Sequence, residues 1–128
     1  MSEPEPRLFV YGTLQAGQRN ARVLHPHARG RVPARGLDLG LWTDGRLPWA
    51  WPAPGAHVEG ELVTLADAAA FAALDRFEEV PTLYVRGRVQ VVAGDAPLEV
   101  WTYLAPSDPA ARGWARVGPR WVDPLAAG

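Results

Sequence analysis

The stretch LFVYGTLQAGQRN, residues 8–20, carries four apolar residues straight into a loop with two glycines. Gly12 and Gly17 have the spacing of a phosphate-binding loop. That motif requires Lys and then Ser or Thr after the second glycine, whereas Gln18 and Arg19 stand there. It also requires a parallel sheet of alternating strands and helices, for which 128 residues leave little room. The stretch therefore predicts a loop that ends a strand, and it excludes a nucleotide site of this kind.

The composition predicts one folded domain over residues 1–128, with a core at about 7–105 and an irregular tail at 106–128. Hydrophobic residues make up 48% of the chain and six residues are Trp, which favours a packed core over disorder. The net charge of −1 gives no general attraction to nucleic acid or to an anionic membrane. No stretch approaches the ~20 apolar residues of a membrane helix, and the first residues lack a signal-peptide core. We therefore expect a cytoplasmic protein that binds neither nucleic acid nor membrane.

Several reactive side chains are absent from the chain. There is no Cys and no Lys, so thiolate nucleophiles, disulfides and Schiff-base lysines are excluded. Ser occurs only at Ser2 and Ser107, and neither lies in a nucleophile elbow. His25 and His27 could ligate a metal only with help from elsewhere, and a solvated loop is the better interpretation. We therefore expect no metal and no cofactor, and any catalysis must rest on Asp, Glu, Tyr or backbone groups.

The order of the expected elements predicts an α+β fold with a small curved or closed sheet. Residues 7–11 form a short buried strand, and residues 84–92 alternate cleanly, which is typical of a strand with one buried face. A GDAP turn at 94–97 joins that strand to a second at 98–104, so the two should form a hairpin. The other expected features are a helical turn at 20–24 with Asn20 as N-cap, an irregular strand at 32–41, an ordered loop at 47–55 that buries its Trp rings, a strand at 57–65, a main helix at 67–79 capped by Asp67 and ended by Pro81, and a tail held by Trp114 and Trp121.

One residue of the main helix stands out on a helical projection. At ~100° per residue, Leu74 and Phe77 lie on the apolar stripe and Glu78 lies at its edge. Glu79 and Asp75 fall on the far side. A carboxylate at an apolar edge in the last helical turn is desolvated and meets the negative end of the helix dipole, so its pKa should rise. Glu78 is therefore the candidate base, although a carboxylate that frays out to solvent at a helix end fits the pattern as well.

Several short motifs occur together with this glutamate: FVYGTL (9–14), Gly17 with Asn20, VEGEL (58–62), LDRFE (74–78), YVR (84–86) and WTYLA (101–105). In this order and spacing they resemble the gamma-glutamylcyclotransferase superfamily, in the branch that includes gamma-glutamylamine cyclotransferase and the AIG2-like proteins. The resemblance covers about residues 8–105. It implies a small mixed β-barrel of about five to seven strands with one main helix and short flanking helices.

The resemblance also implies a chemistry that needs no enzyme nucleophile. The substrate's α-amine attacks its own γ-carbonyl and gives 5-oxoproline with a released amine or amino acid. The partner would be a small gamma-glutamyl compound, and the protein a monomer or homodimer without a cofactor. Glu78 would be the catalytic base, the backbone of Tyr11, Gly12, Thr13 and Leu14 would bind the γ-glutamyl part, and Tyr84 and Tyr103 would line the pocket.

Other interpretations of the same residues stay open at this point. A non-catalytic binding or scaffold domain could keep the barrel, and a carboxylate-binding module would bind 5-oxoproline without turnover. Arg86 fits a solvated or salt-bridged arginine better than a substrate ligand, and without the resemblance Tyr84 and Tyr103 fit core or rim aromatics. Arg19 and Arg22 could attract a substrate carboxylate, and residues 40–56 could shape the pocket. The amide that is cleaved is not defined by the sequence.

Overall fold

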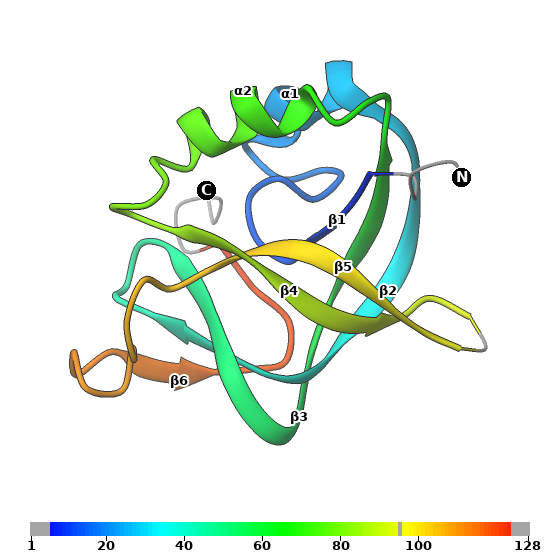
Figure 1. Ribbon diagram of the computed structural model, residues 1–128. Coiled ribbons are helices and arrows are strands. Elements are labelled where there is room, and N and C mark those ends of the chain that lie inside the picture. The colour runs from blue at the N-terminus through cyan, green and yellow to red at the C-terminus, as the bar shows by residue number, and fades with distance from the viewer. Residues whose placement is uncertain (1–5, 95, 124–128) are drawn as a thin grey trace.

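The structure, a computed structural model, describes residues 6–94 and 96–123. Within them, β1, β3, β2, β4 and β5 pair in turn, and β5 returns to β1 in parallel, so that the sheet closes into a mixed barrel. A sixth strand, β6, extends the sheet from β2, and the two short helices lie across one side of the barrel (Figure 1). The predicted α+β fold with a closed sheet is confirmed. The elements are β1 (Arg7–Val10), α1 (Ala21–Leu24), a 3₁₀ turn (His25–His27), β2 (Ala28–Thr43), β3 (Pro48–Leu65), α2 (Ala70–Phe77), β4 (Val85–Val92), β5 (Pro97–Leu104) and β6 (Ala115–Val117).

Strand β1 is buried on both faces, as its unbroken apolar run predicts. Leu8 and Val10 pack with the helices, whereas Phe9 and Tyr11 point into the barrel and join its interior cluster. Because successive side chains of a strand alternate, one short strand contributes to both halves of the core. The backbone of β1 also approaches β3 closely: a Cβ at Gly60 would lie 2.2 Å from the carbonyl oxygen of Val10. Gly60 is therefore required for this contact.

The expected loop at residues 47–55 is wrong, because β3 begins at Pro48 and runs through this segment. Its prolines fit the strand through their spacing. The N–H of Ala50 donates to the Tyr11 hydroxyl and not to β2. Pro48 and Pro52 lie two positions away on either side, so they share the orientation of Ala50 and leave the ladder with β2 intact. The number of prolines alone therefore does not decide whether such a segment forms a strand.

Strand β2 is longer than the expected range 32–41, since it spans Ala28–Thr43. A register shift near its middle lets residues 53–56 of β3 leave the ladder opposite Asp38. Asp38 adopts a left-handed backbone with φ 52°, and its carboxylate accepts a hydrogen bond of 2.8 Å from the N–H of Gly55. The side chain of Asp38 thus stabilises the irregularity that its own backbone creates.

The main helix is shorter than the expected range 67–79, because α2 comprises only Ala70–Phe77. The N–H groups of residues 70–72 bond to carbonyls three positions earlier, which gives a tighter turn before the helix. Asp67 was expected to cap the helix. Its carboxylate instead accepts the N–H of Ala69 at 2.9 Å and stabilises that preceding turn. Among the described residues, neither helix is long and apolar enough to cross a membrane.

The predicted hairpin of residues 84–92 and 98–104 is confirmed as β4 paired with β5. Val89 and Val91 are buried in the barrel, and Val85 is half-buried. Asp95, in the expected GDAP turn, lies outside the described residues. Arg88 faces solvent and pairs with Glu99 across the hairpin at 2.7 Å.

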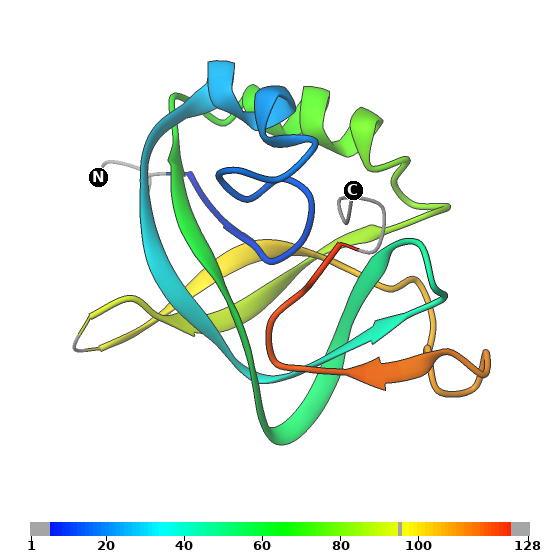
Figure 2. The same ribbon diagram turned by 180° about the vertical axis from the view of Figure 1, so that it is seen from behind.

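The tail is more regular than expected, since residues 115–117 form β6 on the edge of β2. The two tryptophans hold it as predicted. Trp121 is buried within the barrel cluster, and the ring of Trp114 stacks on Trp49 with centroids 4.2 Å apart. From β6 the chain returns toward the loop that follows β1 (Figure 2), where Arg19 Nε lies 2.7 Å from Asp123 Oδ2.

Candidate active site

A cavity of about 240 Å³ lies between the loop after β1, the end of α2 and the chain that leads into β4. It is lined by the candidate base Glu78 and by Tyr11, Gly12, Thr13, Leu14, Tyr84 and Tyr103, the residues that the resemblance implies for substrate binding. From the segment 40–56, Leu47 and Pro48 line it as well. The lining residues are Phe9, Val10, Tyr11, Gly12, Thr13, Leu14, Asn20, Leu47, Pro48, Phe77, Glu78, Glu79, Leu83, Tyr84 and Tyr103.

The loop after β1 is held in place from β2 and β3. Glu61 of β3 accepts the N–H of Ala16 at 2.8 Å. Arg31 of β2 connects Glu61 to the loop, because its Nη1 donates to Glu61 at 3.0 Å and to the carbonyl of Leu14 at 3.1 Å. Asn20 was expected to cap α1 with its side chain, but its amide donates to Thr13 Oγ1 at 2.9 Å instead. Asn20 therefore occupies the predicted N-cap position of α1, but its side chain closes the loop and makes no cap hydrogen bond.

The same loop lines the cavity and carries unused backbone donors. Within the described part of the chain, the N–H groups of Gly12, Thr13 and Leu14 have no hydrogen-bond partner. Thr13 and Leu14 are buried, so these amides are shielded from bulk water as well. Consecutive free N–H groups form a nest that suits negative charge.

Gly12 is required for packing. Its φ is not left-handed, but an added Cβ would lie 2.7 Å from Cγ of Pro48 across the cavity wall. Pro48 in turn accepts the hydrogen bond of the Tyr84 hydroxyl through its carbonyl, at 2.6 Å. A side chain at position 12 would therefore displace the wall that holds Tyr84.

Glu78 is the residue that directly follows α2, and its N–H still bonds to the carbonyl of Leu74 at 2.9 Å. Its carboxylate lines the cavity and has no ion-pair or hydrogen-bond partner among the described residues. Burial raises the pKa of Glu78 from 4.5 to about 7. A carboxyl group with this pKa can accept and return a proton near neutral pH. Glu79, by contrast, is exposed at the mouth of the cavity, with φ 53°.

Three tyrosine hydroxyls surround this carboxylate, and all three are already used as donors. Tyr11 donates to the carbonyl of Tyr103 and accepts the N–H of Ala50 at 3.1 Å. Tyr84 donates to a backbone carbonyl and Tyr103 donates to Asp75 at 2.7 Å. Burial is the main cause that raises the pKa of each phenol well above 10, and the charge of Glu78 raises it further. The hydroxyls therefore stay protonated and are unsuited to act as bases.

The helical projection misplaced two residues of α2. Phe77 was expected in the core, but its side chain is 39% exposed at the cavity. Asp75 was expected on the solvent side, but it is half-buried and bonds to Tyr103 and to Arg86, whose Nε lies 2.9 Å away. Arg86 is thus the salt-bridged arginine that the sequence analysis favoured. The projection failed because α2 lies on the outer face of β4 and β5, from which Arg86 and Tyr103 rise to meet it. In the sequence, the only sign of the contact between Asp75 and Arg86 was the outward position of Arg86 on its strand.

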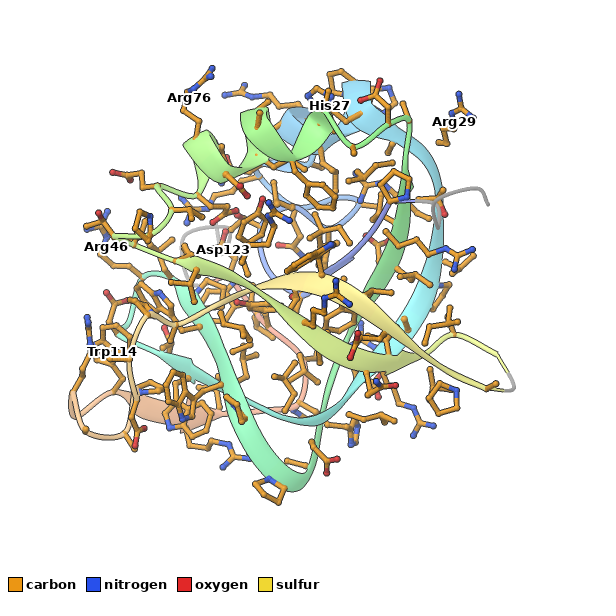
Figure 3. All side chains as sticks on the ribbon, viewed as in Figure 1. His27, Arg29, Arg46, Arg76, Trp114 and Asp123 are labelled. Atoms are coloured by element: carbon orange, nitrogen blue, oxygen red, sulfur yellow. The ribbon has the colours of Figure 1, made fainter. Side chains whose placement is uncertain are left out.

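Other candidates lie away from the cavity. Arg19 and Arg22 are exposed and do not line it, and Arg19 is paired with Asp123. His25 is exposed and His27 half-buried, and the described residues hold no group of three or more metal-ligating side chains. Asp123 is buried, whereas Figure 3 shows Arg76 pointing from α2 into solvent.

The hydroxyl of Tyr11 offers a direct test of this geometry. Tyr11→Phe should lower the free energy of unfolding by about 1–3 kcal/mol, because it leaves the buried N–H of Ala50 and the carbonyl of Tyr103 unpaired. Chemical denaturation of the variant beside the wild type measures this difference. An unchanged denaturation midpoint would contradict the assignment of this hydroxyl as the link between β1, β3 and β5.

Comparisons with known proteins agree with this fold. A family model described as "Gamma-glutamyl cyclotransferase, AIG2-like" matches residues 8–122. Gamma-glutamylaminecyclotransferase of Homo sapiens is 40% identical over 101 residues, which cover 70% of this chain and 65% of the human protein. Its Bos taurus counterpart is 33% identical over 126 residues, which cover 90% of this chain and 69% of the bovine protein. The match thus spans just under two thirds of the human relative.

The fold is shared with a solved structure as well. The crystal structure of an AIG2-like protein from Mus musculus superposes with a TM-score of 0.70 at 26% identity. The superposition covers 94% of this chain and 90% of the mouse chain.

Proposed function

The chain belongs to the gamma-glutamyl cyclotransferase, AIG2-like family, and from this premise we propose that it cleaves a γ-glutamyl amide and releases 5-oxoproline. The leaving group is an amine or an amino acid. γ-Glutamyl amines are the first class to consider, because the curated relatives are named gamma-glutamylaminecyclotransferases. The observation that carries the proposal is Glu78, a half-buried carboxylate without a partner among the described residues and with a pKa of about 7.

In the proposed reaction the substrate cyclises on itself. Glu78 removes a proton from the substrate's α-ammonium, and the resulting amine attacks the γ-carbonyl carbon. A C–N bond forms within the new ring, the original amide C–N bond breaks, and Glu78 returns the proton to the leaving amine. The ring nitrogen also gives up a second proton, which passes to the leaving nitrogen, so that the amine departs as an ammonium ion. The enzyme supplies no nucleophile, in keeping with a chain that has neither Cys nor Lys. Its contribution is to hold the amine close to the carbonyl.

The loop after β1 is proposed to bind the γ-glutamyl part. The N–H groups of Gly12, Thr13 and Leu14 have no partner in the described residues, so they can bond negatively charged oxygen without breaking a bond of the fold. Donors fixed in advance stabilise charge better than donors that must reorganise. Tyr11 anchors the start of this loop, and Arg31 with Glu61 anchors its far end.

The proposal is tested with a panel of γ-glutamyl amines, γ-glutamyl amino acids and the ε-linked lysine isopeptide. We expect at least one of them to yield 5-oxoproline, detected by mass spectrometry, with release of an equal amount of amine. Folded protein that binds 5-oxoproline but turns over no member of the panel would instead be a carboxylate-binding module. Failure to bind or to convert any of them would favour a scaffold domain on the same barrel.

The raised pKa of Glu78 predicts the pH dependence of this reaction. The base must be ionised to accept a proton, so kcat/KM should rise with pH and level off above an apparent pKa near 7. A pH profile of kcat/KM on any active substrate measures this midpoint. A profile that stays flat from pH 5 to 8 would exclude a carboxylate with this pKa as the base.

Stability should change with pH in the opposite direction. The folded state binds a proton at Glu78 up to about pH 7, whereas the unfolded chain releases it near 4.5. Between these values the folded state holds more protons, so the free energy of unfolding falls as pH rises through this window. The Glu78→Gln variant lacks this contribution, and the stability difference between it and the wild type should therefore grow from pH 4.5 to pH 8.

The setting of the protein belongs to the same proposal. We expect it to act in the cytoplasm on a small molecule, without a nucleic acid or membrane partner, as a monomer or homodimer. The net charge of −1 supports the absence of a polyanionic partner. Size-exclusion chromatography with light scattering distinguishes the two oligomeric states.

A further inference from the structure

The hydroxyl groups of Tyr84 and Tyr103 already donate their protons to other groups of the protein. A phenol carries one O–H proton and two acceptor lone pairs. The proton of Tyr84 goes to the carbonyl of Pro48, and the proton of Tyr103 goes to the carboxylate of Asp75. A carbonyl and a carboxylate can only accept, so the direction of both bonds is fixed. Toward the cavity these two oxygens can therefore only accept hydrogen bonds.

The acceptor of the Tyr103 proton is itself held rigidly. Both oxygens of Asp75 receive hydrogen bonds from Arg86, at 2.9 Å to Oδ1 and 3.2 Å to Oδ2. The guanidinium lies over the rings of Phe71, at 4.4 Å, and Trp101, at 4.6 Å. The planar, charged Arg86 keeps the Asp75 carboxylate in one orientation. The Tyr103 hydroxyl consequently has one orientation available.

The cavity thus has two walls of opposite character. The loop after β1 offers backbone donors, namely the free N–H groups of residues 12–14. Tyr84 and Tyr103 line the same cavity and offer acceptors only, and Glu78 does so when it is ionised. A ligand that forms hydrogen bonds with both sets of groups must carry negative oxygen at one end and several N–H donors at the other. An α-amino acid head group, with its carboxylate and its ammonium, has this composition.

From this arrangement we propose that Asp75 is a positioning residue, which fixes Tyr103 as an acceptor and so completes, with Tyr84 and Glu78, a binding site for the primary ammonium group of the ligand. The inference rests on the proposed function only for the identity of that ligand as a γ-glutamyl compound. Asp75 acts through Tyr103 and does not touch the ligand. The site binds the ammonium ion first, and Glu78 then takes one of its three protons.

The test compares two probes that differ only in this group. L-Glutamine carries the α-ammonium, and glutaramate is the same γ-amide without it. We expect wild-type protein to bind L-glutamine at least tenfold more tightly than glutaramate in titration calorimetry. Asp75→Ala and Tyr103→Phe should each weaken L-glutamine binding about tenfold or more, as expected for a lost hydrogen bond to a charged group, and change glutaramate binding less than threefold.

A matched control distinguishes the positioning of Tyr103 by Asp75 from a general effect of removing a surface carboxylate. Glu99 pairs with Arg88, a β4 arginine that also lies over Trp101, but it contacts no tyrosine hydroxyl. Glu99→Ala should leave the binding of both probes unchanged. If it weakens L-glutamine binding as much as Asp75→Ala does, the effect comes from surface charge and the inference is overturned.

A double variant tests whether Asp75 acts through Tyr103. In the Tyr103→Phe background, Asp75→Ala should cause little further loss of L-glutamine affinity, because the hydroxyl it positions is gone. The same loss in both backgrounds would assign Asp75 a merely structural role. If Asp75→Ala does not fold, Tyr103→Phe still decides, since it keeps the ring and deletes only the acceptor. If Tyr103→Phe keeps the full preference for L-glutamine over glutaramate, the proposed ammonium site is wrong.

These results are independent of turnover. Selective L-glutamine binding without 5-oxoproline from any γ-glutamyl compound would refute the proposed reaction and leave the ammonium site standing. Formation of 5-oxoproline with equal binding of L-glutamine and glutaramate would do the reverse.

Discussion

Glu78→Gln is expected to lower turnover by at least ~10²–10⁴, the range ascribed to general base catalysis. The amide keeps the shape of the carboxylate and most of its hydrogen-bonding capacity, but it does not accept the proton. Binding of 5-oxoproline should stay near the wild-type value, because the loop after β1 is unchanged. The free energy of unfolding should stay the same or rise, since a half-buried charge at the C-terminal end of α2 is removed. Single-turnover kinetics and thermal unfolding on the same preparation measure both effects.

The neighbouring carboxylate provides the matched control. Glu79 follows Glu78 directly and lines the mouth of the cavity, but its side chain is exposed. Glu79→Gln should change the rate by less than about threefold, as is usual for a surface substitution. If Glu79→Gln is the inactive variant, or if both variants remain active, the assignment of the base is wrong.

Gly12→Val is expected to abolish turnover and to weaken 5-oxoproline binding. A Cβ at this position would lie 2.7 Å from Cγ of Pro48, so the loop or the facing wall must shift. Pro48 cannot rotate away as a flexible side chain would, and its carbonyl holds the hydroxyl of Tyr84. Packing an extra branched side chain into such a site typically costs about 1–3 kcal/mol of stability. Thermal unfolding should therefore show a folded but less stable variant.

Gly30→Val is the control for this substitution. Gly30 is exposed in β2, and an added Cβ meets no atom within 4 Å. The same change of side chain should leave turnover and ligand binding near wild type there. A folded Gly12→Val protein with wild-type kinetics would remove the loop after β1 from the site.

The parts of the fold that follow from the sequence are those whose burial pattern is regular. The run 8–11 is apolar at every position because β1 is buried on both faces, and residues 85–92 alternate because β4 has one buried face. Residues 47–55 escaped prediction because two of their prolines face away from the β2 ladder, an orientation that depends on the partner strand. Local composition contains no information about which side of a strand its neighbour occupies.

The site was predictable where one residue's environment sufficed. Glu78 stood out because a carboxylate at an apolar edge is costly, whatever lies opposite. The role of Asp75 escaped prediction because it depends on Tyr103 and Arg86, which are 28 and 11 positions away. The projection also assumes that one face of a helix meets a packed core. The end of α2 overhangs a cavity, which explains the exposure of Phe77.

The parallel pairing of β1 with β5 has a consequence for how the protein assembles. The pairing is stabilised by Thr102, whose hydroxyl donates to the carbonyl of Phe9, 93 positions away in the sequence. During synthesis the loop that presents residues 12–14 emerges early, but its anchoring strand finds its second neighbour only after nearly all of the barrel has been made. Closing so long a segment costs entropy before any contact compensates for it, and folds dominated by such pairings reach the native state slowly, over about milliseconds to seconds. The cavity, bounded by both ends of this long connection, is therefore among the last features of the nascent chain to form.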